Sequence, residues 1–217
     1  MKEKAPRAHV HVDAVQALGK IPLDVTAGPI DSLAISAHKI HGPKGAGALW
    51  LRRGARVTSL TIGGSQEHGV RPGTENASGA VGLGLAAEQA ERARTEAYPR
   101  WTALRNRLLE RARSIFPTVR QNGDPALAAP HITSLAFPGV AAEPLLHALE
   151  ARGIFVSAGS ACSSKNKGPS ATLRAVGVTD GMGVLRVSFS RFTTEAEVDR
   201  AASALAAAID ELRPTIR

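Results

Sequence analysis

The residues best suited to chemistry stand together in Ser36–Gly45, which reads Ser-Ala-His-Lys-Ile-His-Gly-Pro-Lys-Gly and follows an apolar run typical of a buried strand. A serine hydroxyl and an imidazole can donate hydrogen bonds to a phosphate, and a lysine amine can condense with an aldehyde. The pattern favours pyridoxal 5′-phosphate, with Ser36 and His38 at its phosphate and Lys39 as the Schiff-base lysine. A solvated lysine in an ordinary turn would give a similar local sequence.

A carboxylate lies 26 residues upstream, where the alternating run His9–Asp13 predicts a strand. Asp13 could keep a pyridine nitrogen protonated, and Gln16 could hydrogen-bond the phenolic oxygen of the ring. Asp13 could also cap a helix that begins at Ala14, and the two roles are compatible. His9 and His11 share a strand face, but no third ligand stands at a recognisable spacing, so we predict no metal site.

The single cysteine, Cys162, stands in a run of small polar residues, Ser157–Ser164. Such a run is typical of a loop, whereas structural cysteines are usually buried in apolar elements. We therefore expect an exposed thiol that can act as a nucleophile. One cysteine permits neither an internal disulfide nor a four-thiolate zinc site, which fits a reducing cytoplasm.

Five motifs occur in an order that resembles the cysteine desulfurases, pyridoxal-phosphate enzymes of the class V aminotransferase type. The resemblance runs from about His9 to the C-terminus, and the Cys162 run favours the branch with a long cysteine loop. The motifs are Val12–Ala17, Ser36–Gly45, Gly63–Asn76, Ser157–Ser164 and Leu185–Arg191. The resemblance implies fold type I, with the C-terminal part of a large cofactor domain followed by a smaller α/β domain.

The resemblance also implies a role for each matching residue. Lys39 holds the cofactor and shuttles protons, and Thr74 reaches across a dimer interface to the partner's cofactor phosphate. Arg186 binds the substrate α-carboxylate through two hydrogen bonds, a task that suits the parallel N–H groups of arginine. Other roles are open from the residues alone: Thr74 could be a helix N-cap, Arg186 a strand-edge charge, and Arg191 is a less favoured carboxylate ligand.

The implied reaction converts L-cysteine to L-alanine, with Cys162 taking the sulfur as a persulfide. A sulfur-acceptor or iron–sulfur scaffold protein would receive it, and the full-length form would be a homodimer. A related selenocysteine lyase or aminotransferase, or a non-catalytic remnant that dimerises or binds acceptors, are the alternatives. Family members are about twice as long and carry a phosphate-cradling turn in their N-terminal half, so we expect this chain alone to be inactive.

The formal charge of +8 does not by itself indicate nucleic-acid binding. The basic residues of the middle segment alternate with glutamates, as on a solvated helix face, and no aromatic-studded strand accompanies them. No apolar run is long enough to span a membrane, so neither a nucleic acid nor a membrane is an expected partner. The arginines in question are Arg92, Arg94, Arg100, Arg105, Arg107, Arg111 and Arg113.

Strand and helix patterns alternate along the chain, which predicts α/β architecture. We place a boundary near Thr95, with residues 1–95 as the remainder of the cofactor domain and 96–217 as the small domain with the cysteine loop. The last helix should begin with a capping box, Thr194 with Glu197. The predicted strands are Ala8–Asp13, Leu33–Ser36, Gly47–Arg52, Ile132–Phe137, Ile154–Ser157 and Val184–Phe189. The predicted helices are Glu75–Thr95, Tyr98–Phe116, Ala142–Arg152, Pro169–Val176 and Glu195–Leu212.

Overall fold

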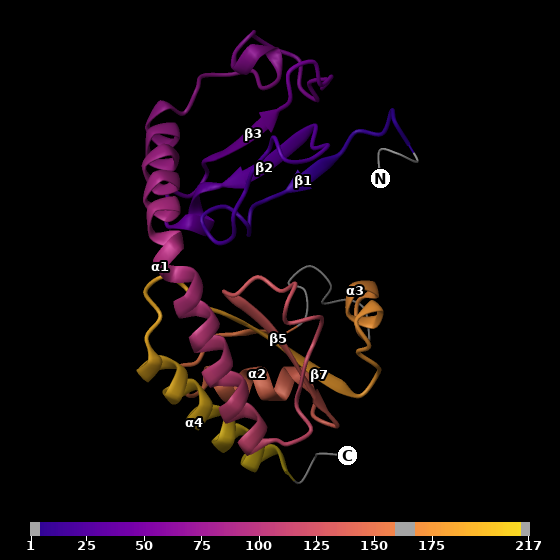
Figure 1. Ribbon diagram of the computed structural model, residues 1–217, viewed down its shortest axis with the longest axis vertical. Helices are drawn as coiled ribbons and strands as arrows, with labels where there is room; N and C mark the ends of the chain where they lie inside the picture. Colours follow the sequence, from indigo (N-terminus) through magenta and orange to yellow (C-terminus); the bar gives the residue numbers. More distant parts are fainter. Residues whose placement is uncertain (1–4, 159–167, 214–217) are drawn as a thin grey trace. The chain divides into compact units, whose positions relative to one another are not determined.

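The first three strands form one sheet in the order β1-β2-β3, with β1 parallel to β2 and β3 antiparallel to it (Figure 1). The computed structural model describes residues 5–158 and 168–213, and the chain divides into two compact units, Met1–Thr95 and Glu96–Arg217. This sheet belongs to the first unit. Its strands are β1 (His11–Asp13), β2 (Ser32–Ser36) and β3 (Gly47–Leu51).

The strand β1 is shorter than the predicted Ala8–Asp13 because its approach to β2 is irregular. The backbone N–H of Val10 donates to the carboxylate of Asp31 at 2.8 Å, and the carbonyl of Val10 accepts from Asp31. A side-chain acceptor has replaced the carbonyl that a regular ladder would use. The regular pairing therefore starts only at His11, which lies opposite Ser32.

The core of the first unit is small and rich in alanine. A 3₁₀ turn, η1 (Ala37–Ile40), follows β2 and packs against the first half of α1 (Ala77–Ile115). A second 3₁₀ turn, η2 (Glu67–Gly69), has no buried residue. Small side chains let backbones approach closely, so the turn is held tightly against the helix. The buried residues of this cluster are Ala37, Ile40, Leu83, Ala86 and Ala90.

The prediction of two helices around Thr95 is wrong, because α1 runs without a break from Ala77 to Ile115 with Pro99 inside it. A proline lacks the N–H that would bond the carbonyl four residues earlier, which here is Thr95. The helix therefore loses one internal hydrogen bond without ending. The division between the two units falls at the same residue, Thr95.

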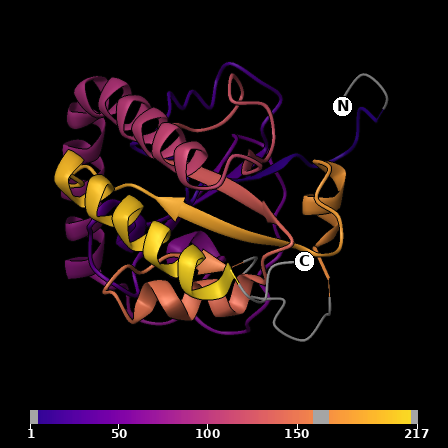
Figure 2. The ribbon, with the colours of Figure 1, turned by 90° about the horizontal axis from the view of Figure 1, so that it is seen from below.

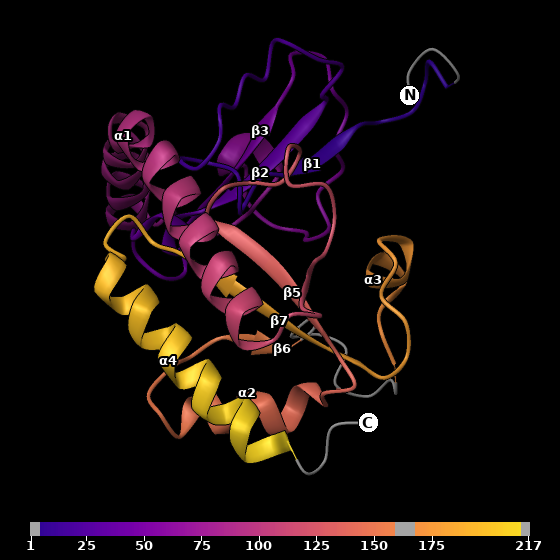
Figure 3. The ribbon, with the colours of Figure 1, turned by 60° about the horizontal axis from the view of Figure 1, so that its bottom comes forward.

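The sheet of the second unit has the order β4-β5-β7-β6, with every neighbouring pair antiparallel (Figure 3). The two-residue strand β4 was missed, and β6 lies later than the predicted Ile154–Ser157. Both are short edge strands, for which a sequence pattern carries little signal. The strands are β4 (Arg120–Gln121), β5 (Ile132–Pro138), β6 (Ser157–Ala158) and β7 (Met182–Ser188).

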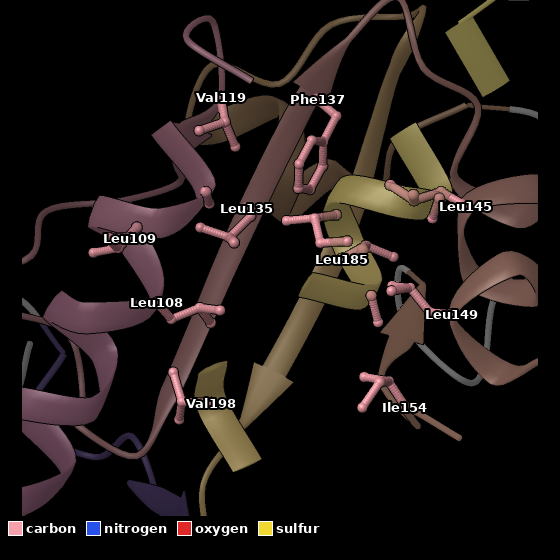
Figure 4. Packing of buried hydrophobic residues seen from close by; sticks show 14 of the residues in the cluster. Leu108, Leu109, Val119, Leu135, Phe137, Leu145, Leu149, Ile154, Leu185 and Val198 are labelled. Carbon is pink, nitrogen blue, oxygen red and sulfur yellow. The ribbon is translucent and has the colours of Figure 1, made fainter. Parts of the chain in front are cut away.

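Helices cover this sheet, and α4 (Glu195–Leu212) lies between α2 (Ala142–Glu150) and the later half of α1 (Figure 2). The predicted capping box of α4 is confirmed, because Thr194 and Glu197 bond each other's backbone N–H groups. Aliphatic side chains of the helices meet β5 and β7 in the main core (Figure 4). On the opposite face Leu173 of α3 (Ala171–Ala175) packs against a smaller cluster.

The solvated-face interpretation of the arginines holds for some members and fails for one. Arg92 pairs with Glu88, and Arg94 with Glu91, as i,i+4 and i,i+3 partners on the helix surface. Arg105 is instead buried, with 8% of its surface exposed. Among residues 5–158 and 168–213, no helix is long and apolar enough to cross a membrane.

Candidate active site

The parallel pairing of β1 and β2 brings two predicted site segments to the same sheet edge. Asp13 lies opposite Ala34 in the register, and the backbone N–H of Ala14 donates to the Ala34 carbonyl at 2.9 Å. The strand β2 ends two residues later, at Ser36, where η1 begins. The carboxyl ends of parallel strands are the usual ligand-binding edge of open α/β sheets. Asp13 and the Ser36–Lys39 segment therefore share that edge.

The turn η1 fixes which side chains face solvent. Ala37 and Ile40 are buried at 0% and 1% exposure, which leaves His38 and Lys39 on the outer side of the turn. The Ser36 hydroxyl and His38 Nδ1 lie 2.8 Å apart and share a hydrogen bond. A hydroxyl and an imidazole thus stand together beside an exposed amine.

Gly42 permits the close approach that holds this turn in place. A Cβ at this position would lie 3.0 Å from the Cβ of Ala37 and 3.0 Å from the Cβ of Ala86. The residue before it, His41, has the left-handed backbone conformation (φ 65°), and the N–H of Gly42 donates to the carbonyl of Ala37. The glycine in the motif therefore has a packing reason that does not depend on any ligand.

Asp13 already caps the backbone that follows it. Its Oδ1 accepts a hydrogen bond from the N–H of Val15 at 2.9 Å, so Asp13 does cap the backbone as that interpretation proposed. The segment it caps is a series of turns, in which Leu18 bonds Ala14, and not the expected helix. The Asp13 and Gln16 side chains are both exposed, so each can still reach a ligand at this edge.

The N-cap interpretation of Thr74 is wrong, because Asn76 caps α1. The Asn76 side-chain oxygen accepts the N–H of Gly79 at 3.0 Å, whereas the carbonyl of Thr74 accepts from Arg71. The Thr74 side chain is exposed and caps no helix. Its role in another subunit stays a prediction.

Arg186 lies on β7 in the second unit, directly opposite Ser157 of β6. Its Nη2 donates to the Ser157 hydroxyl at 3.3 Å, and its side chain is exposed. Sequence reasoning missed Ser157 as a site residue, because only the strand register shows that it faces Arg186. Cys162, five residues further along the chain, lies outside the described residues.

Arg191, the less favoured carboxylate candidate, lies in the turn after β7. Its guanidinium stacks 4.9 Å from the ring of Phe192, and its Nε is buried without a hydrogen-bond partner. His9 and His11 both bond the hydroxyl of Ser32, at 2.8 and 2.7 Å. In the described part of the chain no three His, Cys, Asp or Glu side chains gather as a metal site.

The family model for class-V aminotransferases matches residues 1–201. The chain belongs to the class-V aminotransferase family. It is 46% identical over 205 residues to a protein named cysteine desulfurase from Trichormus azollae, a match that covers 94% of this chain and 51% of that protein. The chain therefore spans about half the length of the curated relatives it matches.

Solved structures in the same family have the same fold. The chain superposes on a NifS-like protein with a TM-score of 0.86 and 33% identity, over 97% of this chain and 55% of that one. A NifS-like protein from Rickettsia africae gives a TM-score of 0.85 at 29% identity, over 96% and 55%. These likenesses confirm the predicted α/β fold of a class-V, fold-type-I protein.

Proposed function

We propose that this chain is part of a cysteine desulfurase, which converts L-cysteine to L-alanine and retains the sulfur as a persulfide on Cys162. The observation that carries the proposal is the sheet edge where the Ser36–His38 pair and the exposed Lys39 amine stand beside Asp13. Relatives named cysteine desulfurase, at 46% identity, support this choice of reaction within the family.

The donor set of this edge fits pyridoxal phosphate. Ser36 and His38 would hold the phosphate, and Lys39 would attach the aldehyde carbon covalently. Asp13, on the neighbouring strand, would hold a proton at the ring nitrogen, and Gln16 would donate to the phenolic oxygen. When bound, such a cofactor withdraws electrons from the substrate α-carbon. Lys39, once released, would move a proton at that carbon.

Two groups of the second unit would act on the substrate itself. Arg186 presents a guanidinium that can take a carboxylate with two parallel hydrogen bonds, which would fix the amino acid by its α-carboxylate. The Cys162 thiolate would attack the substrate sulfur, so that the carbon–sulfur bond breaks and a sulfur–sulfur bond forms. The substrate carbon keeps the electron pair, gains a proton and leaves as alanine.

The proposal includes a homodimer in the full-length protein, with Thr74 serving the partner's phosphate site. Its support is the segment before Thr74, where Val57, Leu60 and Ile62 are 40%, 100% and 105% exposed. Apolar side chains that are this exposed commonly mark an interface. A sulfur-acceptor or iron–sulfur scaffold protein would then take the persulfide sulfur, in a cytoplasm where a free thiol persists.

The proposed function can be tested with two substitutions and one control, made in a full-length protein that contains this chain. Lys39→Ala should abolish the visible absorption of bound cofactor, while Lys44→Ala, a change to another exposed lysine of the same motif, should leave it unchanged. Cys162→Ala should keep that absorption and lose persulfide formation, measured by persulfide trapping after cysteine addition. Equal persulfide yields from parent and Cys162→Ala would assign the sulfur chemistry to another nucleophile.

A further inference from the structure

Two nitrogens of one guanidinium in the second unit are buried without a hydrogen-bond partner among the described residues. Arg105 of α1 is 8% exposed, and its Nε and Nη1 are fully buried with no hydrogen bond in the described chain. On a helix with 100° per residue, Arg105 falls within the arc that runs from Leu104 through Trp101 to Leu109, and these three residues are buried. Its side chain therefore leaves the helix toward the core and not toward solvent.

A second orphaned group lies on the strand that α1 covers. Thr133 of β5 is 2% exposed, and its hydroxyl has no hydrogen-bond partner among the described residues. Alternate residues of a strand share a face, so Thr133 points to the same side as Leu135 and Phe137. Those two residues pack with α1 in the main core, where Leu108 points toward β5 (Figure 4).

Contacts at both ends align α1 with β5. The rings of Trp101 and His131 are 5.6 Å apart, and the rings of Phe116, just beyond α1, and Phe137 are 5.9 Å apart. From Trp101 to Arg105 the helix advances about 6 Å, and from His131 to Thr133 the strand advances about 6.6 Å. The guanidinium of Arg105 and the hydroxyl of Thr133 therefore face the same level of the α1–β5 interface.

The charge at this part of the α1–β5 interface comes from Arg105 alone among the buried residues of the described chain. Arg105 offers only donors, the Thr133 hydroxyl can donate or accept, and Arg105 forms no ion pair with a carboxylate of the described chain. Trp101, on the same helix face, contributes an indole N–H that donates to the Ser190 carbonyl at 2.9 Å, and its ring centroid lies 5.6 Å from that of His131. A buried cation without a partner is strongly unfavourable, so a ligand with negative oxygen atoms would stabilise the site.

We propose that Arg105 and Thr133 form a buried site for a carboxylate between α1 and β5. The carboxylate has two sources with the same chemistry: a side chain from the part of a full-length protein outside these 217 residues, or a free small carboxylate such as formate. The site uses none of the residues assigned to the proposed desulfurase activity, and it does not depend on that activity.

The test is the thermal unfolding midpoint of the 217-residue chain, titrated with sodium formate against sodium gluconate at constant ionic strength in chloride-free buffer. Gluconate, with six carbons and five hydroxyls, is expected to be too large to reach the buried Arg105 and Thr133. The midpoint should rise with formate and saturate, and Arg105→Met should remove the rise. Arg113→Met, which changes an exposed arginine of the same helix, is the matched control and should respond to formate like the parent.

Two further measurements distinguish the two sources of the carboxylate, and they keep the test valid if Arg105→Met does not fold. Thr133→Val, a nearly isosteric change, should weaken the formate response without removing the buried charge. The chain joined to the preceding half of the Trichormus azollae relative should lose the response if the protein supplies the carboxylate, and keep it if the ligand is free. Arg105→Met should then destabilise that longer form. The proposal would be overturned if formate did not raise the unfolding midpoint of the 217-residue chain, or if it raised that of Arg105→Met equally. Either result would mean that water, and not a carboxylate, solvates Arg105.

Discussion

At the scale of single residues, the register of the strands brings side chains together that are far apart in the sequence. Ser157 is the clearest case, because it stands opposite Arg186 and accepts from its Nη2 at 3.3 Å. An exposed arginine side chain samples many rotamers, and a fixed acceptor beside it limits them. Ser157 is therefore a positioning residue for the proposed carboxylate contact of Arg186.

Ser157→Ala in the full-length form should raise the KM for cysteine about fivefold, with kcat little changed, because a hydrogen bond of about 1 kcal/mol is lost from an orienting group. Ser188→Ala is the control, since Ser188 is an exposed serine on β7 in the same face as Arg186. Steady-state kinetics and the dissociation constant of a non-reacting carboxylate analogue measure the effect. A fall in kcat without any change in KM would contradict this role.

The sequence predicted residue chemistry better than residue surroundings. The pairing of the Ser36 and His38 side chains agrees with the cluster that the motif suggested, because both residues lie within one short turn. The burial of Arg105 was missed, because its charge outweighed its position one helical turn after Trp101. Thr74 was offered as a helix cap, but Asn76, whose side-chain oxygen reaches Gly79, has that role. Charge and composition predict that a typical arginine is exposed. The burial of Arg105 follows instead from its position on the apolar face of α1.

At the scale of elements, most strands and helices were predicted, and α4 was predicted with its observed bounds and capping box. Elements with periodic apolar residues give a strong signal, whereas the two-residue strands β4 and β6 depend on pairing with distant strands. The continuity of α1 through Pro99 was also missed. A proline favours a helix end locally, but burial of Ala97, Trp101 and Leu104 on either side of it stabilises the continuous helix.

Two glycine substitutions should change stability in opposite directions. Gly42→Ala would place a Cβ 3.0 Å from Ala37 and Ala86, and this overpacking should cost about 1–3 kcal/mol of unfolding free energy. Gly84→Ala lies on α1 with no atom within 4 Å, and should add up to about 1 kcal/mol through helix propensity. Urea unfolding of both variants measures the difference. Equal effects of the two changes would mean that η1 does not pack against α1 as described.

An ion pair between α1 and α4 should make stability depend on acid. Arg107 bonds Asp199 through two nitrogens, and the nearer contact is 2.6 Å. The hydrogen bond from Arg107, with its charge, lowers the pKa of Asp199 below the ordinary value. Because the folded pKa is the lower one, this stabilisation is present above the unfolded pKa of about 3.9 and is lost as the pH falls below it.

Asp199→Asn should therefore flatten the acid limb of the stability curve, with a smaller loss of stability than the parent between about pH 5 and pH 3. Asp180→Asn changes an exposed aspartate without an ion pair in the described chain, and should follow the parent curve. Chemical denaturation at a series of pH values gives the comparison. Parallel curves for parent and Asp199→Asn would show that the pair contributes nothing measurable, as many exposed pairs do.

At the scale of the whole molecule, the residues named in the proposed function are divided between the two units. The Lys39 edge belongs to Met1–Thr95, Arg186 to Glu96–Arg217, and the chain spans about half of its curated relatives. The sheet behind Lys39 has three strands, with the short β1 at its edge. An open edge strand pairs readily with other chains, so the first unit is prone to association when it stands alone.

The 217-residue chain prepared by itself should bind pyridoxal phosphate weakly and should not sustain alanine production from cysteine. Lys39 can condense with the aldehyde, and Ser36 and His38 are the proposed phosphate ligands, but two ligands would hold the phosphate loosely, and a loosely held group loses rate steeply with small displacements. A titration with the cofactor, followed by visible absorption, and an alanine assay with the full-length Trichormus azollae relative as positive control measure both properties. Stoichiometric tight binding with continued alanine release would show that β1, β2 and η1 suffice to build the cofactor site, and that the preceding half of the relatives supplies little of it.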